Sequence, residues 1–208
     1  MRILDLFCGA GGASMGYHRA MPDAEIIGID IDPQPDYPFT FIQGDALRPP
    51  FNLDDFDLIH ASPPCQSYSS MSNRYGSDQP ELISKVRSMI EDRPYVIENV
   101  VGASKEMNSN LILCGSMFGL QTRRHRLFET SFLVPGLKCG DHTGHIPVYG
   151  PPDGRRLSGP KEAPTLNAWK SITEGQKALG IDWTESWHSI REAIPPAYTE
   201  YIARFIET

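Results

Sequence analysis

The chain has 208 residues, a formal net charge of −7 and 40% hydrophobic residues. This length suffices to bury the core of one compact domain, and no apolar run approaches the ~20 residues of a membrane-spanning helix. An acidic protein is not expected to bind polyanions through its overall charge, so such binding would depend on a local basic cluster. The sequence starts with a strand and lacks a signal-peptide pattern, and its four cysteines lack a disulfide framework. We therefore expect a single domain over residues 1–208 in a reducing, cytoplasmic compartment.

The first apolar run leads into a glycine-rich turn. Ile3 starts a segment that reads as a strand, and Cys8–Gly12 forms a turn before a helix that begins near Ala13. Glycines let the backbone approach a ligand closely, and the helix N-terminus behind them points at that ligand. Turns of this kind serve many ligands, so the motif alone indicates only a ligand-binding edge.

Two further strands end in acidic residues. Ala24–Asp30 and Phe39–Ile42 both read as buried strands, and Asp45 follows the second one. Carboxylates at the C-terminal ends of neighbouring strands can accept hydrogen bonds from ribose hydroxyls. Each aspartate alone could instead cap a helix or lie in a solvated turn. Together with the glycine-rich turn, they favour a nucleoside cofactor site.

A cysteine follows the next apolar run. Phe56–Ala61 reads as a buried strand, and the tetrapeptide Pro63-Pro64-Cys65-Gln66 comes directly after it. A thiol in a rigid turn at a strand end is exposed at the ligand-binding edge, where its thiolate can attack an electrophilic carbon. The alternative is a buried, inert thiol, which is the usual state of a free cysteine. We expect Cys8 and Cys114 to be core thiols of that kind.

A helix and another strand follow. Glu81–Glu91 has helical periodicity, with one apolar side made of Leu82, Ile83, Val86, Met89 and Ile90. Pro94–Val100 reads as a strand that carries Glu98 near its end. Desolvation there can raise the pKa of a carboxyl group, which can then donate a proton. Strands that alternate with helices predict an α/β fold with a doubly wound, mostly parallel sheet.

Basic residues gather in the second half of the chain. Gln121–Phe128 reads as a strand in which Arg124 and Arg126 alternate, so both guanidinium groups are expected on one face. The alternative is a solvated basic edge strand. Further positive charges come from Arg123, Arg155, Arg156 and Lys161. The cluster is a candidate surface for a polyanion, although these charges could also be scattered and solvated.

Taken in order, these motifs resemble those of the C5-cytosine DNA methyltransferases. The turn Phe7–Gly12 is similar to the family's S-adenosylmethionine loop, and Asp30 and Asp45 stand where its ribose-binding and adenine-side acids stand. The resemblance extends to the family's nucleophile, proton-donor and arginine motifs, which here read Pro64-Cys65-Gln66, Glu98-Asn99-Val100 and Arg124-His125-Arg126. It covers Met1 to about Glu129, and several short motifs in the family's order make it specific.

The resemblance implies a class I S-adenosylmethionine-dependent methyltransferase fold, Rossmann-like, with S-adenosylmethionine as cofactor and DNA as partner, its cytosine extruded from the duplex. The cofactor-binding residues it implies are Phe7, Gly9, Gly11, Gly12, Asp30, Ile31, Asp45, Ala46 and Pro63. The implied catalytic residues are Cys65, Glu98, Arg124 and Arg126, and the implied substrate contacts are Pro64, Gln66, Asn99 and Arg124. Such enzymes also occur in restriction–modification pairs.

The family's chemistry explains why these side chains occur together. Carbon 5 of cytosine becomes nucleophilic when a thiolate adds to carbon 6, and protonation of N3 makes that addition easier. The resemblance gives the first role to Cys65 and the second to Glu98, and it places Arg126 near the base oxygen O2. A thiol of ordinary pKa ~8.5 is mostly protonated at neutral pH, so nearby cations or a helix N-terminus must favour the thiolate.

The second half of the chain departs from the family pattern. The family inserts a large target-recognition domain after the arginine motif, whereas Thr130–Pro164 is short and rich in glycine and proline. We therefore expect a loop-rich insertion over residues 130–164 that reads a short or degenerate target, or that needs a partner protein for further DNA contacts. The segment 186–208, with Tyr198, Tyr201, Ile202 and Phe205 at helical spacing, is expected to pack back on the sheet.

One short segment contains potential metal ligands. Cys139, His142 and His145 lie close together in the sequence. A structural zinc ion usually takes four protein ligands, and this segment supplies only three. The sequence therefore predicts a glycine-rich loop and no metal.

The expected function is that of a DNA (cytosine-5-)methyltransferase. An alternative keeps the chemistry and changes the substrate to a free cytidine nucleotide or RNA. Another alternative is a non-catalytic DNA-binding relative that retains only the cofactor site. The presence of Cys65, Glu98 and Arg126 argues against that last alternative.

Overall fold

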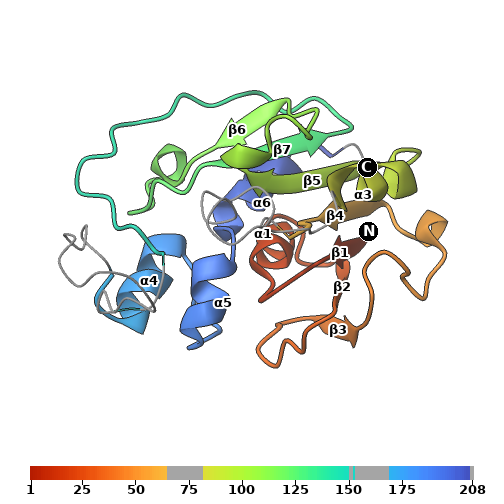
Figure 1. The fold of residues 1–208 in the computed structure, drawn as a ribbon, viewed down its shortest axis with the longest axis horizontal. Helices are drawn as coiled ribbons and strands as arrows, with labels where there is room; N and C mark the ends of the chain where they lie inside the picture. The colour runs from red at the N-terminus through yellow and green to blue at the C-terminus, as the bar shows by residue number, and fades with distance from the viewer. Residues whose placement is uncertain (65–81, 150–151, 153–168, 207–208) are drawn as a thin grey trace.

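A computed structural model describes residues 1–64, 82–149, 152 and 169–206 (Figure 1). Within this part of the chain, seven strands form one sheet in the order β3-β2-β1-β4-β5-β7-β6. The strands are β1 (Arg2–Leu6), β2 (Glu25–Asp30), β3 (Thr40–Gln43), β4 (Leu58–Ala61), β5 (Tyr95–Val100), β6 (Leu111–Leu113) and β7 (Arg126–Thr130). The first five are parallel, and β7 runs antiparallel between β5 and β6. The expectation of a doubly wound, mostly parallel α/β sheet is confirmed.

Helices cover both faces of this sheet. They are α1 (Gly12–Ala20), α3 (Leu82–Ile90), α4 (Ile172–Leu179), α5 (Trp187–Glu192) and α6 (Pro196–Ala203), with short 3-10 helices η1 (Leu53–Asp55), η2 (Val101–Ala103) and η3 (Gly115–Phe118). In Figure 1, α4 and α5 lie at one side of the molecule, away from α3. No helix in the described ranges is long and apolar enough to span a membrane.

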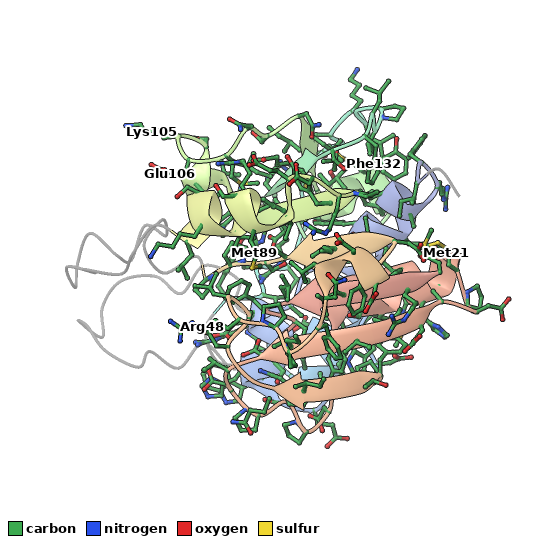
Figure 2. All side chains as sticks on the ribbon, turned by 90° about the vertical axis from the view of Figure 1, so that its right-hand side faces the viewer. Met21, Arg48, Met89, Lys105, Glu106 and Phe132 are labelled. Carbon is green, nitrogen blue, oxygen red and sulfur yellow. The ribbon has the colours of Figure 1, made fainter. Side chains whose placement is uncertain are left out.

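The side chains of the central strands point alternately to the two faces of the sheet, and this divides the core into two layers. Successive side chains of a strand point to opposite faces, and in β1 Ile3 packs with α1 and α6 while Leu4 packs with α3. Buried apolar residues on both faces explain why these strands read as continuous apolar runs. Met89 extends from α3 toward the strands in the side view of Figure 2. It is partly buried against the layer that contains Leu4.

The helix predicted over Glu81–Glu91 forms as α3, with Ile83, Val86 and Ile90 buried against the sheet. Its apolar positions recur at helical spacing, so one side of the helix meets the core and the other meets solvent.

The strand expected over Gln121–Phe128 begins later than the sequence indicates. β7 starts at Arg126, which is paired with Val100 of β5 and Leu113 of β6. Both neighbouring strands end at these pairs, so residues before Arg126 have no ladder to join. The prediction that Arg124 and Arg126 alternate along one strand is therefore wrong, and Arg124 lies in the loop before β7.

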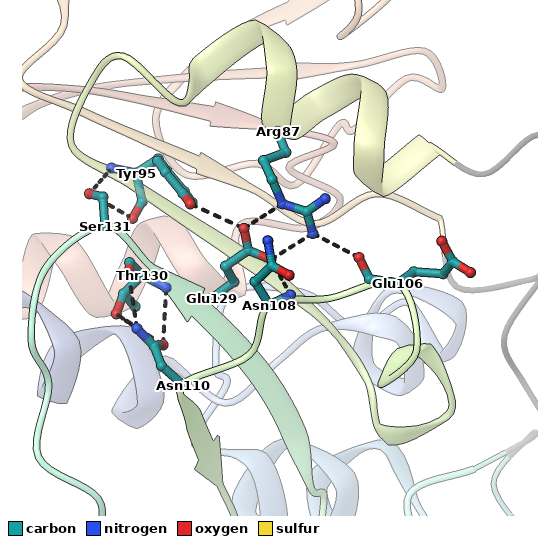
Figure 3. A network of polar contacts seen from close by, with 8 residues as sticks. All are labelled: Arg87, Tyr95, Glu106, Asn108, Asn110, Glu129, Thr130 and Ser131. Carbon is teal, nitrogen blue, oxygen red and sulfur yellow. Dashed lines mark hydrogen bonds and ion pairs between the residues drawn. The ribbon is translucent and has the colours of Figure 1, made fainter.

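A polar network links α3 to the far end of β7. Glu129 accepts hydrogen bonds from Arg87 Nε (2.6 Å), the Tyr95 hydroxyl (3.1 Å) and the Asn108 backbone (2.8 Å), as Figure 3 shows. Burial alone would raise the pKa of Glu129, but the donors, Arg87 first among them, outweigh burial and lower it. The second Arg87 nitrogen also donates to the carbonyl of Glu106. This network joins α3 and the segment before β6 to the C-terminal end of β7.

The C-terminal helix α6 packs against α1 with almost no space between them. Thr199 Oγ1 donates to the Ala13 carbonyl at 2.8 Å, and a Cβ atom built on Gly16 would overlap Thr199 Oγ1 and the Pro196 carbonyl oxygen. Glycine is thus required at position 16 by close approach of two backbones. Tyr198 and Ile202 of α6 reach the sheet core beside Ile3.

The Gly16→Ala variant is expected to lose about 1–3 kcal/mol of unfolding free energy, because added atoms in a filled contact force the helices apart. This loss would exceed the gain that alanine normally brings to a helix. Urea unfolding of both proteins measures it. Gly136→Ala is the matched control, since nothing lies within 4 Å of a Cβ at that position. Equal stability of the Gly16 variant and the wild type would show that the contact is not tight.

Candidate active site

The expected cofactor residues converge at the C-terminal ends of β1, β2 and β3. The turn after β1 has three residues in the left-handed region, Phe7 (φ 58°), Gly9 (φ 48°) and Gly11 (φ 83°). A non-glycine residue there is uncommon and costs of order 1 kcal/mol. Gly11 is the N-cap residue of α1, so the turn leads directly into the helix N-terminus.

The glycines of this turn have different surroundings. A Cβ on Gly11 would lie 2.9 Å from Pro38, and one on Gly12 would overlap the Ile194 carbonyl, whereas a Cβ on Gly9 would meet nothing within 4 Å. At Gly11 and Gly12, glycine is needed because neighbouring atoms leave no room for a side chain. Gly9 instead faces open space beside the turn.

Asp30 ties the turn to β2. Its Oδ2 accepts a hydrogen bond from the Gly9 backbone at 2.9 Å, and its Oδ1 accepts one from the Asp32 backbone at 3.0 Å. A carboxylate offers about four lone-pair sites, so acceptor capacity remains for ribose hydroxyls. Ile31 next to it is 64% exposed, which leaves an apolar surface for an adenine ring. The residues present thus fit a nucleoside.

The other expected cofactor residues differ in exposure, and Asp45 is the exposed one among them. Asp45 Oδ1 accepts a hydrogen bond from the Leu47 backbone at 2.9 Å, so this carboxylate also closes its own turn. Ala46 and Pro63 are buried, while Pro64 is exposed.

A buried acidic residue lies beneath the turn, and the sequence reasoning missed it. Asp5 of β1 is fully buried, and its Oδ2 accepts a hydrogen bond of 2.5 Å from Ser14, whose hydroxyl lies 2.6 Å from that of Tyr37. Oδ1 of Asp5 is buried and lacks a hydrogen-bond partner among the described residues. Burial, with a further contribution from the charge of Asp30, raises the pKa of Asp5 to about 7. An acidic residue inside an apolar strand was the signal that could have revealed it.

The C-terminal part of the chain also contacts the turn. Trp183 Nε1 donates to the Ala10 carbonyl at 2.8 Å, and Thr184 Oγ1 donates to Asp36 at 2.7 Å. No local pattern in the sequence points to these contacts, because each joins residues more than a hundred positions apart.

The acid motif and the arginine motif meet across β5 and β7. Glu98 is 5% exposed, and Arg126 Nε lies 2.9 Å from its Oε1. Burial raises the pKa of Glu98, and the nearby Arg126, the Ser62 hydroxyl and Arg124 oppose but do not cancel this effect. The site therefore contains a carboxyl group that binds a proton more readily than an ordinary glutamate, beside a fixed cation.

A buried chain of polar groups supports Glu98 from below. The Tyr17 hydroxyl lies 2.9 Å from His60 Nδ1, and His60 Nε2 lies 3.0 Å from Ser62 Oγ. Burial lowers the pKa of His60 to about 3, so the imidazole is neutral at physiological pH. This chain fixes the Ser62 hydroxyl that faces Glu98.

Asn99 connects the acid motif to the segment before the expected nucleophile. Its Nδ2 donates to the Pro63 carbonyl at 2.9 Å, and its Oδ1 accepts from the Val100 backbone at 2.9 Å. The side chain is thereby used to hold the backbone that leads into Pro64. Cys65 and Gln66 lie outside the described residues.

Arg124 occupies a different environment from Arg126. It is 3% exposed, and its guanidinium group donates to the carbonyls of Arg191 (2.5 Å) and Glu192 (3.1 Å) at the end of α5. Burial, and then the charge of Arg126, lowers its pKa to about 9. The Tyr198 hydroxyl donates to the Arg124 carbonyl at 2.5 Å. These contacts join the arginine motif to the C-terminal helices. The further basic residues Arg155, Arg156 and Lys161 lie outside the described ranges.

Comparison with known proteins agrees with this geometry. A solved structure of the Entamoeba histolytica methyltransferase EhMeth superposes with a TM-score of 0.63, 14% sequence identity, and coverage of 99% of this chain and 97% of that chain. The sheet and its helices thus define a Rossmann-like, class I S-adenosylmethionine-dependent methyltransferase fold.

The sequence comparisons identify the family. Residues 1–120 match the model of the C-5 cytosine-specific DNA methylases, and the chain belongs to this family, whose methyl donor is S-adenosylmethionine. Relatives include the type II methyltransferase M2.BsuMI of Bacillus subtilis, 25% identical over 94% of this chain and 55% of the relative. M.XorII of Xanthomonas oryzae is 24% identical over 96% of this chain and 52% of the relative. The chain thus spans about half the length of the curated relatives it matches.

The raised pKa of Asp5 has a consequence for stability. Because the folded state binds this proton more tightly than the unfolded chain, the stabilising contribution is complete below pH ~4 and is lost as the pH rises toward about 7. Asp5→Asn removes the titration and keeps an oxygen acceptor for Ser14. The free energy of unfolding of the variant, relative to the wild type, is therefore expected to increase across this window, by at most ~1.4 kcal/mol per pH unit.

Chemical denaturation between pH 4 and pH 8 measures this difference. Asp23→Asn, the same substitution at an exposed turn position, is measured alongside as the control. A stability difference between Asp5→Asn and the wild type that does not vary with pH would contradict the assigned pKa.

Proposed function

We propose that this chain transfers the methyl group of S-adenosylmethionine to carbon 5 of cytosine in DNA through a covalent adduct between Cys65 and carbon 6. The main support is the buried pair of Glu98 and Arg126. It combines a proton-binding carboxyl group with a fixed cation at the C-terminal edge of the sheet, next to the Pro63 backbone that Asn99 holds. Membership of the C-5 cytosine-specific family supports the same reaction.

The proposed reaction begins with addition to the base. The Cys65 sulfur forms a bond to carbon 6 as Glu98 gives its proton to N3, so the ring electrons shift to carbon 5. S-adenosylmethionine, when bound, would supply the electrophilic methyl group that carbon 5 takes up, and S-adenosylhomocysteine would leave as the methyl–sulfur bond breaks. The proton on carbon 5 then leaves to solvent, the double bond between carbons 5 and 6 re-forms, and the sulfur departs as the thiolate. Glu98 recovers its proton from N3 in the same phase.

The two arginines have separate proposed roles. Arg126 lies beside Glu98 with its side chain 11% exposed, so it can contact the base oxygen O2 while it holds the carboxyl group. Arg124 already donates to two carbonyls at the end of α5, and this favours a positioning role for it rather than contact with the base. Ser62, supported by His60, orients the carboxyl group of Glu98.

The cofactor is proposed to bind at the turn after β1. Gly9 leaves open space for close approach, Asp30 accepts hydrogen bonds from the ribose, and Ile31 covers one face of the adenine. The family motif implies that the nucleoside also contacts Asp45, Phe7 and Pro63. The N-terminus of α1 lies behind the turn at Gly11 and Gly12.

DNA is the proposed substrate, with the target cytosine extruded from the stack, because carbon 5 can be attacked from above the ring only outside the duplex. The segment 130–164, which separates β7 from the C-terminal helices, is short. We therefore propose a short or degenerate target, or a protein partner that adds DNA contacts, since each good base contact supplies only ~1–3 kcal/mol of discrimination.

Methyl transfer from labelled S-adenosylmethionine tests the proposal. Wild-type protein is incubated in parallel with duplex DNA, RNA and dCMP, and the digested bases are identified by mass spectrometry. We expect 5-methylcytosine in the DNA sample, no product with Cys65→Ser, and a loss of at least about 100-fold with Glu98→Gln, since positioned acids contribute ~10²–10⁴-fold. Glu25→Gln, a surface acid paired with Arg2, is the matched control and should retain full activity.

Cofactor binding is followed in the same proteins by the rise in melting temperature with S-adenosylmethionine. The Cys65→Ser variant is expected to keep this rise, which separates lost chemistry from lost folding. Turnover by Cys65→Ser would contradict the covalent route. Product only with RNA or dCMP would assign the chemistry to another substrate, and cofactor binding without turnover on any of the three would identify a non-catalytic relative.

A further inference from the structure

Four potential metal ligands from three parts of the chain meet beside the arginine motif. Cys114 lies at the end of β6, His125 lies between Arg124 and Arg126, and Cys139 and His142 belong to the loop after β7. Their ligand atoms all lie within 4.8 Å of one another. The sequence predicted no metal here, because it showed only the three neighbouring groups Cys139, His142 and His145. In the fold, Cys114 and His125 join Cys139 and His142, and His145 is not part of the group.

Three of the separations between these atoms are close to those expected in a tetrahedral site. Zinc bonds of ~2.3 Å to sulfur and ~2.0–2.1 Å to nitrogen place a sulfur and a nitrogen ligand about 3.6 Å apart in a regular tetrahedron. In the structure, His142 Nε2 lies 3.3 Å from Cys114 Sγ and 3.0 Å from Cys139 Sγ, and His125 Nε2 lies 3.5 Å from Cys139 Sγ. The rings of the two histidines pack edge to face, with centroids 5.1 Å apart and an interplanar angle of 83°.

The surroundings of the cluster resemble the second sphere of a metal site. Ser116 Oγ lies 3.4 Å from each of the two sulfurs and 3.5 Å from His142 Nε2. The Gly140 backbone donates to this hydroxyl at 3.2 Å, which leaves the hydroxyl proton free to be donated to a thiolate. Hydrogen bonds of this kind orient ligands and balance the negative charge of thiolates.

His145 is placed differently from the other two histidines of this region. Its ring packs edge-on against that of His142, with centroids 5.5 Å apart, and it does not belong to the group of four. It therefore offers a matched control within the same loop.

We propose that Cys114, His125, Cys139 and His142 bind one zinc ion. Two thiolates and two imidazoles in a tetrahedral arrangement select zinc over magnesium, calcium or manganese, which prefer oxygen ligands. All four positions are filled by protein, so the site is structural and has no open position for catalysis. The ion replaces the mutual hydrogen bonds of the four groups as the contact that holds them together.

The ion fixes the loop after β7 to the arginine motif. The described residues from Ser131 to Tyr149 form no helix or strand, and several apolar side chains there are exposed, including Leu133 at 85%. Between Val134 and Ile146 no residue is buried. This part of the loop gains little from a hydrophobic core, whereas a metal that closes it contributes directly to folding. Because His125 lies between Arg124 and Arg126, the same ion holds the backbone from which both arginines extend.

Metal content tests this proposal independently of methyl transfer. Protein is purified under reducing conditions, dialysed against a weak chelator, and analysed for bound metals by mass spectrometry. We expect one zinc ion per wild-type chain, and loss of the ion from Cys139→Ala and His142→Ala. His145→Ala and Cys8→Ala are the controls and should retain it. A strong chelator should lower the melting temperature of the wild type, and added zinc should restore it.

Cobalt substitution tests the site in the wild-type protein alone, so its result does not depend on whether the variants fold. A site with two thiolates and two imidazoles should give intense visible ligand-field bands of tetrahedral cobalt and thiolate charge-transfer bands in the near ultraviolet. Wild-type protein without stoichiometric zinc, equal zinc in Cys139→Ala and wild type, or an octahedral cobalt spectrum would each overturn the proposal. A disulfide between Cys114 and Cys139 in the reduced preparation would overturn it as well.

Discussion

The antiparallel pairing of β7 with β5 is the constraint on which the site depends. Val100 is paired with Arg126, so Arg126 lies on the same sheet face as Glu98, which is two residues from Val100 along β5. This diagonal arrangement gives the 2.9 Å ion pair in a region that water scarcely reaches. Removal of two charges from water is unfavourable unless their geometry is good. The register of one strand pair thus sets the position of both groups and the protonation of the carboxyl.

The segments around this pair hold it from several sides. Asn99, on the opposite face of β5, binds the Pro63 carbonyl and so joins the acid motif to the segment before the expected nucleophile. Arg124 and Tyr198 connect the arginine motif to α5 and α6, and α6 packs against α1 behind the turn that follows β1. This edge of the sheet is therefore supported by the C-terminal helices, although these lie far from it in the sequence.

The strands and the glycine turn could be predicted because each depends on a short stretch of sequence. Buried parallel strands are continuous apolar runs, and a turn needs glycine where φ is positive. The start of β7 could not be predicted, since it depends on where β5 and β6 end. The role of Arg124 depends on carbonyls more than sixty positions away, and the four ligands of the proposed zinc site come together only in the fold. The burial of Asp5 could have been predicted, because it is an acidic residue within an apolar run.

Burial raises the pKa of Glu98 despite the adjacent Arg126, and its role as a proton donor depends on this. Carboxyl-carbon NMR titration of glutamate-labelled protein measures this directly, with Glu98→Gln used to assign the signal. We expect a pKa above the ordinary ~4.3 of glutamate in the wild type, and a still higher pKa in Arg126→Gln, where the opposing charge is absent. A wild-type pKa at or below the ordinary value would mean that the ion pair outweighs burial, and Glu98 could not then serve as the proton donor.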